Sequence, residues 1–462
     1  MGSSYRLGIG LLAMVVGAAS GLPLGCSNGN AKAGPCDPTS SSMDGGNGCE
    51  AGATCENTSS GTPGCFAPLS IQGKVIDATN NSPIAGAHVV ARDAEGAVIS
   101  AVAISATDGT YSLIVPATRD AAGKPVSTQY TLRADAASYQ TYPGGVRAAL
   151  PIDATSAAGE PPVIASAATT IGLIPITITG AGSISGTVKI DKPGGTLVDV
   201  EGTTGVADKD GAYTVFNVPA GSHAVQGYIA GTNFAPVTAT VTGGQETKGV
   251  DLTASTNPLG KVTGSVNIVN APGGSVTSVV LVLEDTFNTN LERGEVPKGL
   301  RAGNVTSAFT IDGVPDGKYV VLAAYENDGL VRDPDPNIAG TQIPHITVAG
   351  APVDVGNFKV TGALAVISPG AKVPDPVTGT PTFNWADDSS ETGYDVVVFD
   401  SLGNKIWEDA AIPGYTGSGN PSVQYGGPAL QTGGYYQFRA TSMKNTAPIS
   451  RTEDLLGVFY VQ

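Results

Sequence analysis

The chain has 462 residues, of which 63 are glycine and 32 are proline, and only 14% are charged. Its formal net charge is −16 and it has no basic run, so it would repel nucleic-acid phosphate, and no nucleic-acid partner is expected. Glycine and proline make up about a fifth of the chain, which favours an all-β fold, and the length suits about three or four domains.

The N-terminal segment 1–25 predicts export. Arg6 precedes an apolar run from Leu7 to Leu22, which is too rich in glycine to be a permanent membrane span. The run leads into Leu24-Gly25-Cys26, which resembles the processing site of a bacterial lipoprotein. That resemblance implies a lipid on Cys26 and therefore a membrane as a partner of the N-terminus.

The same segment leaves open how the signal is processed and which membrane holds the lipid. Ordinary cleavage near Ala18-Ala19-Ser20 would leave Cys26 as a free thiol. If Cys26 is lipidated, Ser27 stands where some Gram-negative lipoproteins carry the aspartate of inner-membrane retention. This difference favours the outer membrane of a Gram-negative bacterium.

All five cysteines lie in the first 65 residues. If Cys26 carries lipid, four remain, and four thiols can form two disulfides in an oxidising compartment. Three connectivities are open, and a zinc site is a weak rival because there is no Cys-x-x-Cys pair or nearby histidine. The segment 26–66 is otherwise polar and small, so we expect a short disulfide-stapled tether. The disulfide candidates are Cys36, Cys49, Cys55 and Cys65.

A short pattern recurs along the chain. The stretch 208–221 aligns with Phe309–Tyr319 when Tyr213 is set on Phe309, and a shorter copy spans Thr107–Pro116. Asp-Gly supplies a turn with positive φ, the aromatic residue and the residue two further on share one face of a strand, and proline ends the pairing. The repeat predicts tandem β-sandwiches, each with an aromatic residue in its core.

The first expected domain, 67–180, carries four motifs in order: Gly-x-Val at 73–75, Pro-x-Ala-Gly-Ala-x-Val at 83–89, Thr-Asp-Gly-x-Tyr at 107–111 and Tyr-x-Leu at 130–132. This order resembles the carboxypeptidase regulatory-like domain, which implies a transthyretin-like β-sandwich without peptidase activity. Within this domain, residues 143–170 are expected to be a loop or linker.

Two further copies are expected at 181–257 and 258–362, because Ser183–Val188 and Val262–Val266 repeat the opening strand. The third copy has acidic insertions at 284–295 and 326–337. Clustered carboxylates could bind Ca²⁺, but no EF-hand spacing occurs, so solvated acidic loops are preferred.

The last expected domain, 363–462, resembles fibronectin type III. Leu430, Gly433 and Tyr436 have the spacing of its tyrosine corner, which implies a hydroxyl bound to upstream backbone. Trp385 would be its core tryptophan, and Trp407 is expected to be partly buried rather than a sugar-stacking platform.

The sequence offers no catalytic constellation, and no cofactor or metal is expected. The three histidines, His88, His223 and His345, occupy different positions of the repeats. There is no nucleophile elbow, phosphate loop or dinucleotide fingerprint. The related collagen-adhesin repeats suggest one covalent alternative, a Lys261–Asn357 isopeptide bond with Glu284 as promoter, which is disfavoured.

The sequence therefore predicts a non-enzymatic cell-surface lipoprotein, a stalk of β-sandwiches for adhesion or envelope scaffolding, with a protein or polysaccharide partner. A carbohydrate-binding array that docks a polysaccharide is one alternative. A non-catalytic accessory subunit of an exported hydrolase is the other.

Overall fold

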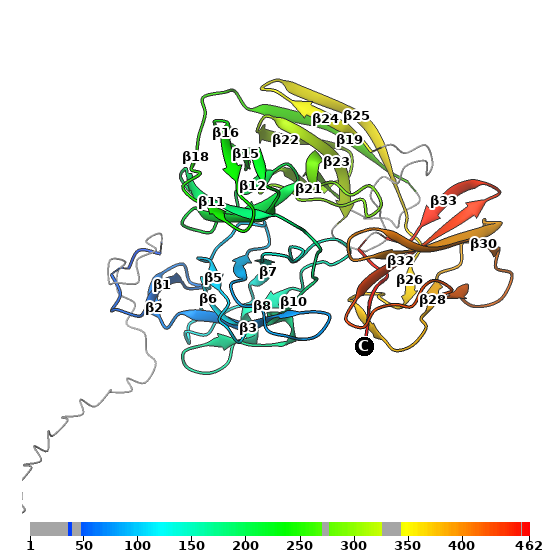
Figure 1. Ribbon diagram of the computed structural model, residues 1–462, viewed down its shortest axis with the longest axis horizontal. Helices are drawn as coiled ribbons and strands as arrows, with labels where there is room; N and C mark the ends of the chain where they lie inside the picture. Colours follow the sequence, from blue (N-terminus) through cyan, green and yellow to red (C-terminus); the bar gives the residue numbers. More distant parts are fainter. Residues whose placement is uncertain (1–35, 39–47, 270–276, 326–342, 454) are drawn as a thin grey trace, which may run out of the picture.

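The computed structural model describes residues 36–38, 48–325 except 270–276, and 343–462 except 454. The described residues form strands, turns and three short 3-10 helices, arranged as a small N-terminal hairpin and four β-sandwiches (Figure 1). This is the all-β, tandem-sandwich architecture that the repeated motif predicts.

The hairpin pairs β1 with β2 and precedes the first sandwich. In the first sandwich one sheet has the order β10-β3-β6, with β9 also on β3, and the other has the order β5-β4-β7-β8. The elements are β1 (Thr54–Asn57), β2 (Pro63–Phe66), β3 (Leu69–Asp77), β4 (His88–Arg92), β5 (Ala103–Ile104), β6 (Thr110–Val115), β7 (Gln129–Asp135), β8 (Ile152–Asp153), η1 (Ala154–Ser156), β9 (Val163–Ile164), η2 (Ala167–Thr169) and β10 (Thr170–Leu173).

The segment 143–170 is not the loop or linker expected from its composition. It contributes Ile152 to β8 and Ile164 to β9, and both side chains lie in the core of the first sandwich. Strand β9 pairs in parallel with β3 next to β10. The composition of this segment does not predict these strands, because each is only two residues long and is too short to show an alternating pattern. Strand β9 also pairs with β3, which is far away in the sequence.

The second sandwich packs a sheet of order β14-β11-β17, with β18 also on β11, against a sheet of order β13-β12-β15-β16. Its elements are β11 (Gly182–Lys189), β12 (Leu197–Val200), β13 (Thr203–Val206), β14 (Ala212–Val218), β15 (Gly221–Tyr228), β16 (Val237–Val241), β17 (Glu246–Thr247) and β18 (Leu252–Thr253).

The third sandwich packs a sheet of order β22-β19-β25 against a sheet of order β21-β20-β23-β24. Its elements are β19 (Gly260–Val269), β20 (Thr277–Leu283), η3 (Glu284–Thr286), β21 (Arg301–Val305), β22 (Ala308–Val314), β23 (Gly317–Tyr325), β24 (His345–Val348) and β25 (Pro352–Thr361).

The first three sandwiches share one plan. In each, the opening strand β3, β11 or β19 pairs antiparallel with the strand that carries the aromatic residue of the repeat, and in parallel with the closing strand or strands. The turn glycines Gly109 and Gly211 precede β6 and β14 and have φ of 78° and 92°, which side chains with a Cβ rarely adopt. In the third sandwich the Asp-Gly pair lies inside β22, where Gly313 has φ of 68° at the position that Asn217, with φ of 62°, has in β14. The aromatic residues of the repeat, all less than a tenth exposed, are Tyr111, Tyr213 and Phe309.

The fourth sandwich has a different plan, with a sheet of order β26-β28-β31 and a six-stranded sheet of order β27-β34-β32-β29-β30, to which β33 is added on β32. Its strands are β26 (Val366–Ser368), β27 (Asp375–Val377), β28 (Thr382–Trp385), β29 (Gly393–Asp400), β30 (Lys405–Pro413), β31 (Ser422–Gln424), β32 (Tyr435–Lys444), β33 (Ala447–Arg451) and β34 (Val458–Val461).

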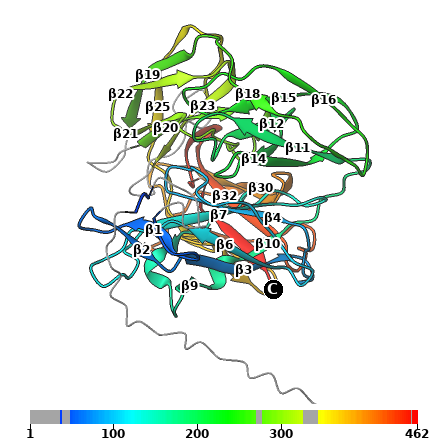
Figure 2. The ribbon, with the colours of Figure 1, turned by 90° about the vertical axis from the view of Figure 1, so that its left-hand side faces the viewer.

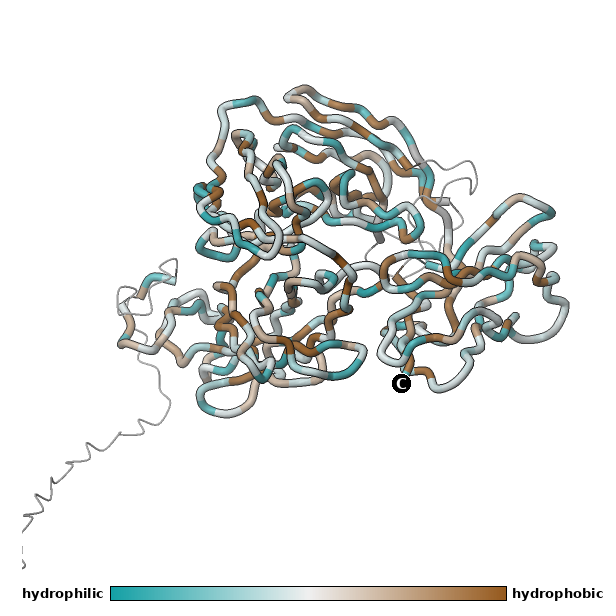
Figure 3. Tube along the Cα trace, in the orientation of Figure 1, coloured by the Kyte–Doolittle hydropathy of each residue, from teal (hydrophilic) through white to brown (hydrophobic). Residues whose placement is uncertain are grey.

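The four sandwiches do not follow one another in a line as a stalk would. The second and third lie over the first, and the fourth lies beside the first and third (Figures 1 and 2). Hydrophobic stretches alternate with hydrophilic ones along the strands, as expected for sheets with one buried face (Figure 3). One apolar core continues from the third sandwich into its neighbours through Val90 and Val98 of the first and Leu197, Val206 and Tyr228 of the second.

Candidate functional site

The cysteines pair in one of the three open connectivities. Cys36 bonds to Cys55 and Cys49 bonds to Cys65. Three of these sulfur atoms lie within 4.8 Å of one another, but each is committed to a disulfide and is not available as a thiolate for zinc. The proposed lipid acceptor Cys26 lies outside the described residues.

The disulfide-linked hairpin is fixed to the first sandwich by a buried ion pair. The guanidinium of Arg119 donates to Glu56, and both side chains are 2% exposed. Glu56 also accepts from the backbone N–H of Ala117, and Arg119 donates to the carbonyl of Ala67 at 2.9 Å and lies over the ring of Phe66. Burial raises the pKa of Glu56 even beside Arg119. The second half of the expected tether is therefore a docked element and not a free spacer.

The three histidines belong to three different sandwiches and do not converge. The His88 ring packs edge-on against Phe216, His223 contacts Glu201 at 3.0 Å, and Nδ1 of His345 lies 2.8 Å from Glu284. Burial lowers the pKa of His88 and outweighs the attraction of Asp135 and Glu246. Each ring therefore has a local structural partner.

The acidic loop 284–295 differs from the solvated loop that the sequence predicts. Glu292 is 2% exposed and pairs with Arg439 and Arg451 of the fourth sandwich, while Glu295 pairs with Arg133 of the first. No three carboxylates converge in the part of the chain that the structure describes, and 326–337 lies outside it. The loop uses its charges to join sandwiches.

The three residues of the isopeptide alternative are separated. Lys261 contacts Asp312 at 3.2 Å, and the pairing of β19 with β25 sets Lys261 opposite Pro352 and Ser265 opposite Asn357. Glu284, the candidate promoter, is bound to His345. The geometry does not place the lysine, the asparagine and the glutamate together.

A buried charge network lies where the first, second and third sandwiches meet. Arg133, 1% exposed, contacts Asp135 on its own strand, Glu295 of the third sandwich and Thr204 of the second. Burial by itself would raise the pKa of Glu295, but Arg133 and the neighbouring Arg92 hold it below its usual value. Burial lowers the pKa of Arg92 to about 10. Sequence reasoning missed this network because its members are spread over 204 residues and no motif links them.

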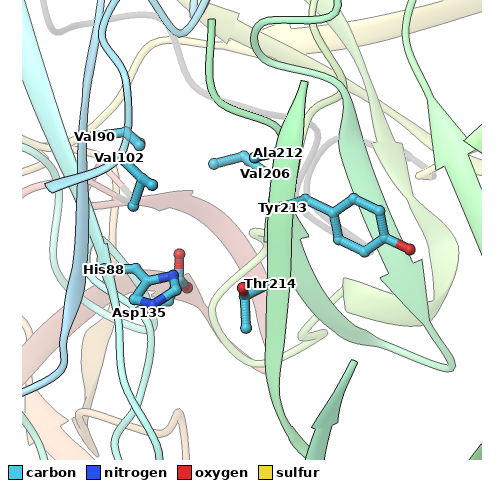
Figure 4. A pocket seen from close by; sticks show the side chains of 8 residues that line it. All are labelled: His88, Val90, Val102, Asp135, Val206, Ala212, Tyr213 and Thr214. Carbon is cyan, nitrogen blue, oxygen red and sulfur yellow. The ribbon is translucent and has the colours of Figure 1, made fainter. Parts of the chain in front are cut away.

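A small cavity lies between the first and second sandwiches, with a volume of about 60 Å³. His88 and Asp135 lie on one wall, and Thr214 lies on the other (Figure 4). A buried water needs roughly 10–15 Å³ of such space, so the cavity has room for a few waters and not for a metabolite. We therefore do not regard it as a binding site for a metabolite.

A larger cavity, with a volume of about 270 Å³, lies between the third and fourth sandwiches. Its lining combines two arginines and two carboxylates with hydroxyl, amide and apolar groups. The lining residues are Thr289, Asn290, Glu292, Asp395, Val397, Phe399, Arg439, Thr441 and Arg451. The sequence carries no signal for it, because the residues come from separate strands and loops of two sandwiches.

The two tryptophans do not form an exposed aromatic platform. Trp385 is fully buried in the fourth core, and Trp407 is half-buried against Phe383 and Tyr425. The hydroxyl of Tyr436 accepts a hydrogen bond from the backbone N–H of Gln431 at 3.0 Å, as the expected corner requires. These aromatic residues build the core.

No helix among the described residues is long and apolar enough to cross a membrane. No family model matches the chain, and no curated protein sequence matches it.

Among solved structures, the TIE protein of Bacillus anthracis matches 82% of this chain and 68% of its own, with 11% identity and a TM-score of 0.16. BcpA, the major pilin subunit of Bacillus cereus, matches 64% of this chain and 99% of its own, with 10% identity and a TM-score of 0.17. A tetra-tandem repeat from the extending region of a large adhesion protein matches 83% of this chain and 98% of its own, with 14% identity and a TM-score of 0.13. TM-scores this low support no transfer of function to this chain.

Proposed function

We propose that the protein is a non-enzymatic lipoprotein of the cell surface, in which a lipid on Cys26 holds an array of β-sandwiches at the membrane for adhesion or envelope scaffolding. Within this proposal, the first three sandwiches are regulatory-like modules and the fourth is a fibronectin type III-like module. The outer membrane of a Gram-negative bacterium is the proposed location.

The observation that carries the proposal is the disulfide-linked hairpin and its attachment. Two disulfides suit an exported chain, because thiols stay reduced in the cytosol. The buried Glu56–Arg119 pair joins the hairpin to the first sandwich. Only the short stretch between Cys26 and Cys36 separates a lipid from this fixed point, and an extended chain of that length spans at most roughly 35 Å. A lipid on Cys26 would thus hold the sandwiches close to the bilayer.

The test is metabolic labelling of the full chain with an alkyne palmitate, followed by separation of inner and outer membranes. The parent and a Ser27→Ala control should incorporate label and sediment with the outer membrane, and Cys26→Ala should lose both properties. Equal labelling of Cys26→Ala, or an unlabelled parent, would refute the anchor. Protease added to intact cells then tests display at the surface.

A further inference from the structure

We propose that the cavity between the third and fourth sandwiches binds one neutral, hydroxyl-rich ring, the size of a single sugar unit. This site goes beyond the display role and does not depend on the lipid anchor. It also differs from an aromatic platform, because neither tryptophan takes part in it.

The site lies on the outer face of a sandwich sheet. Along β29, Val396 and Val398 point into the fourth core, so Asp395, Val397 and Phe399 share the opposite face. Strand β32 pairs with β29 and brings two more side chains to this face, because Thr441 lies opposite Asp395 and Arg439 lies opposite Val397. The loop Thr289–Glu292 of the third sandwich closes the cavity from the other side.

Two polar side chains of this face have hydrogen-bonding capacity that the described residues do not use. Oδ1 of Asp395 is buried and accepts no hydrogen bond from any described residue. Arg439 is 2% exposed, and its Nη2 donates to the carbonyl of Leu291 at 2.6 Å. Its buried Nε has no hydrogen-bond acceptor among the described residues, and its Nη1 has only the ion-pair contact with Oε2 of Glu292, at 3.4 Å. Buried donors and acceptors of this kind are almost always satisfied in folded proteins. A ligand that both donates and accepts, after a small local adjustment, would satisfy both.

The balance of charge selects a neutral ligand. Glu292 already contacts both arginines, at 3.4 Å from Arg439 and 3.2 Å from Arg451. An added anion or zwitterion would have to displace this carboxylate, and an added cation would face the two guanidiniums. A hydroxyl group can donate to Asp395 and accept from a guanidinium without a net charge.

The shape and the apolar part of the lining select a ring. Phe399 and Val397 provide an apolar surface next to the polar groups, which suits the C–H face of a sugar. The volume of about 270 Å³ is just below the range of roughly 300–1,000 Å³ that is typical of drug-sized ligand pockets. One ring fits this space better than an extended oligosaccharide.

The test is saturation-transfer-difference NMR on the full-length protein with the methyl glycosides of glucose, galactose, mannose and N-acetylglucosamine. Glucuronate and glutamate serve as anionic and zwitterionic probes. At least one neutral glycoside should receive saturation, with a dissociation constant on the order of 1 mM. The variant Asp395→Leu removes the carboxylate and should weaken that binding at least about tenfold without lowering the melting temperature, since the buried Oδ1 that it removes has no hydrogen bond to a described residue.

The matched control is Asp312→Leu, the same change at an exposed side chain on β22 of the third sandwich. This control should bind the glycoside as the parent does. The proposal is overturned if no neutral glycoside binds, if only glucuronate or glutamate binds, or if Asp395→Leu binds as tightly as the parent. Loss of binding together with an unchanged melting temperature supports it, and the melting temperature distinguishes this result from misfolding.

Discussion

Nη1 of Arg133 lies 2.6 Å from Oε1 of Glu295, although the two residues are 162 positions apart in the chain. The contact joins the first sandwich to the third. Arg133 also contacts Thr204 of the second sandwich, and an apolar core likewise continues across all three sandwiches. The array is therefore held together by its interfaces as well as by its connecting peptides.

The first prediction concerns this ion pair. Arg133→Met removes the cation that pairs with both Asp135 and Glu295 and leaves these two carboxylates without it. The free energy of unfolding should therefore fall by about 3–5 kcal/mol. Denaturant unfolding followed by fluorescence measures this loss. The control is Lys189→Ala, which breaks the exposed Lys189–Asp251 pair and should cost less than about 1 kcal/mol. An equal fall in the free energy of unfolding in the two variants would contradict a stabilising role of the Arg133 ion pairs.

The second prediction concerns pH. Burial, the dominant cause, raises the pKa of Asp199 to about 7, and its 5% exposure agrees with that burial. The folded state binds this proton more tightly than the unfolded state, so the contribution of Asp199 to stability is greatest below about pH 4 and is lost as the pH rises to about 7.

Asp199→Asn should remove this dependence. The amide oxygen can still accept the hydrogen bond that Gly202 donates at 2.9 Å. The variant should match the parent near pH 4 and exceed it at pH 8 by on the order of 2–4 kcal/mol. Thermal unfolding at a series of pH values measures the difference. A parent that gains stability between pH 4 and pH 7 relative to the variant would show that the sign is wrong.

The third prediction concerns the docked hairpin. Arg119→Met leaves the Glu56 carboxylate buried without its cation, and the local free energy of opening should fall by about 3 kcal/mol. Amides of β1 and β2 should then exchange with deuterium roughly a hundredfold faster, while the remainder of the first sandwich keeps its protection. Lys124→Met, an exposed change in the same loop, should leave the exchange of the hairpin unchanged. Unchanged exchange in Arg119→Met would refute the role of the ion pair.

The fourth prediction concerns the contact between the first and fourth sandwiches. A Cβ added to Gly145 would lie 1.7 Å from the carbonyl oxygen of Ser401, which is an impossible approach. Gly145→Ala should separate the two sandwiches and increase the radius of gyration measured by small-angle X-ray scattering. Gly180 also has positive φ, 68° against 58°, but a Cβ there meets nothing within 4 Å. Gly180→Ala therefore controls for backbone strain, and equal scattering from both variants would contradict the packing.

Much of the fold could be predicted because its signals are local. The Asp-Gly turns, the alternating strands and the buried aromatic residues Tyr111, Tyr213 and Phe309 follow from backbone sterics and the two-residue period of a strand. The short strands at Ile152 and Ile164 could not be predicted, because two-residue strands carry no period and their positions depend on a distant partner strand.

The candidate sites were not predictable for a related reason. Arg133, Glu292 and Arg439 are ordinary charged residues in the sequence, and the composition suggested that such residues lie in solvent. Their burial depends on which faces of the sandwiches meet, and no motif encodes that choice.

By itself, the sequence determined the all-β class, the repeated sandwich plan and the even number of cysteines after Cys26, because each depends on neighbouring residues or on simple counting. Only the tertiary structure decided which cysteines pair, how the sandwiches gather into a compact array and where a cavity remains between them. The physical reason is that interfaces are selected by the packing of whole surfaces, whose residues are far apart in the chain.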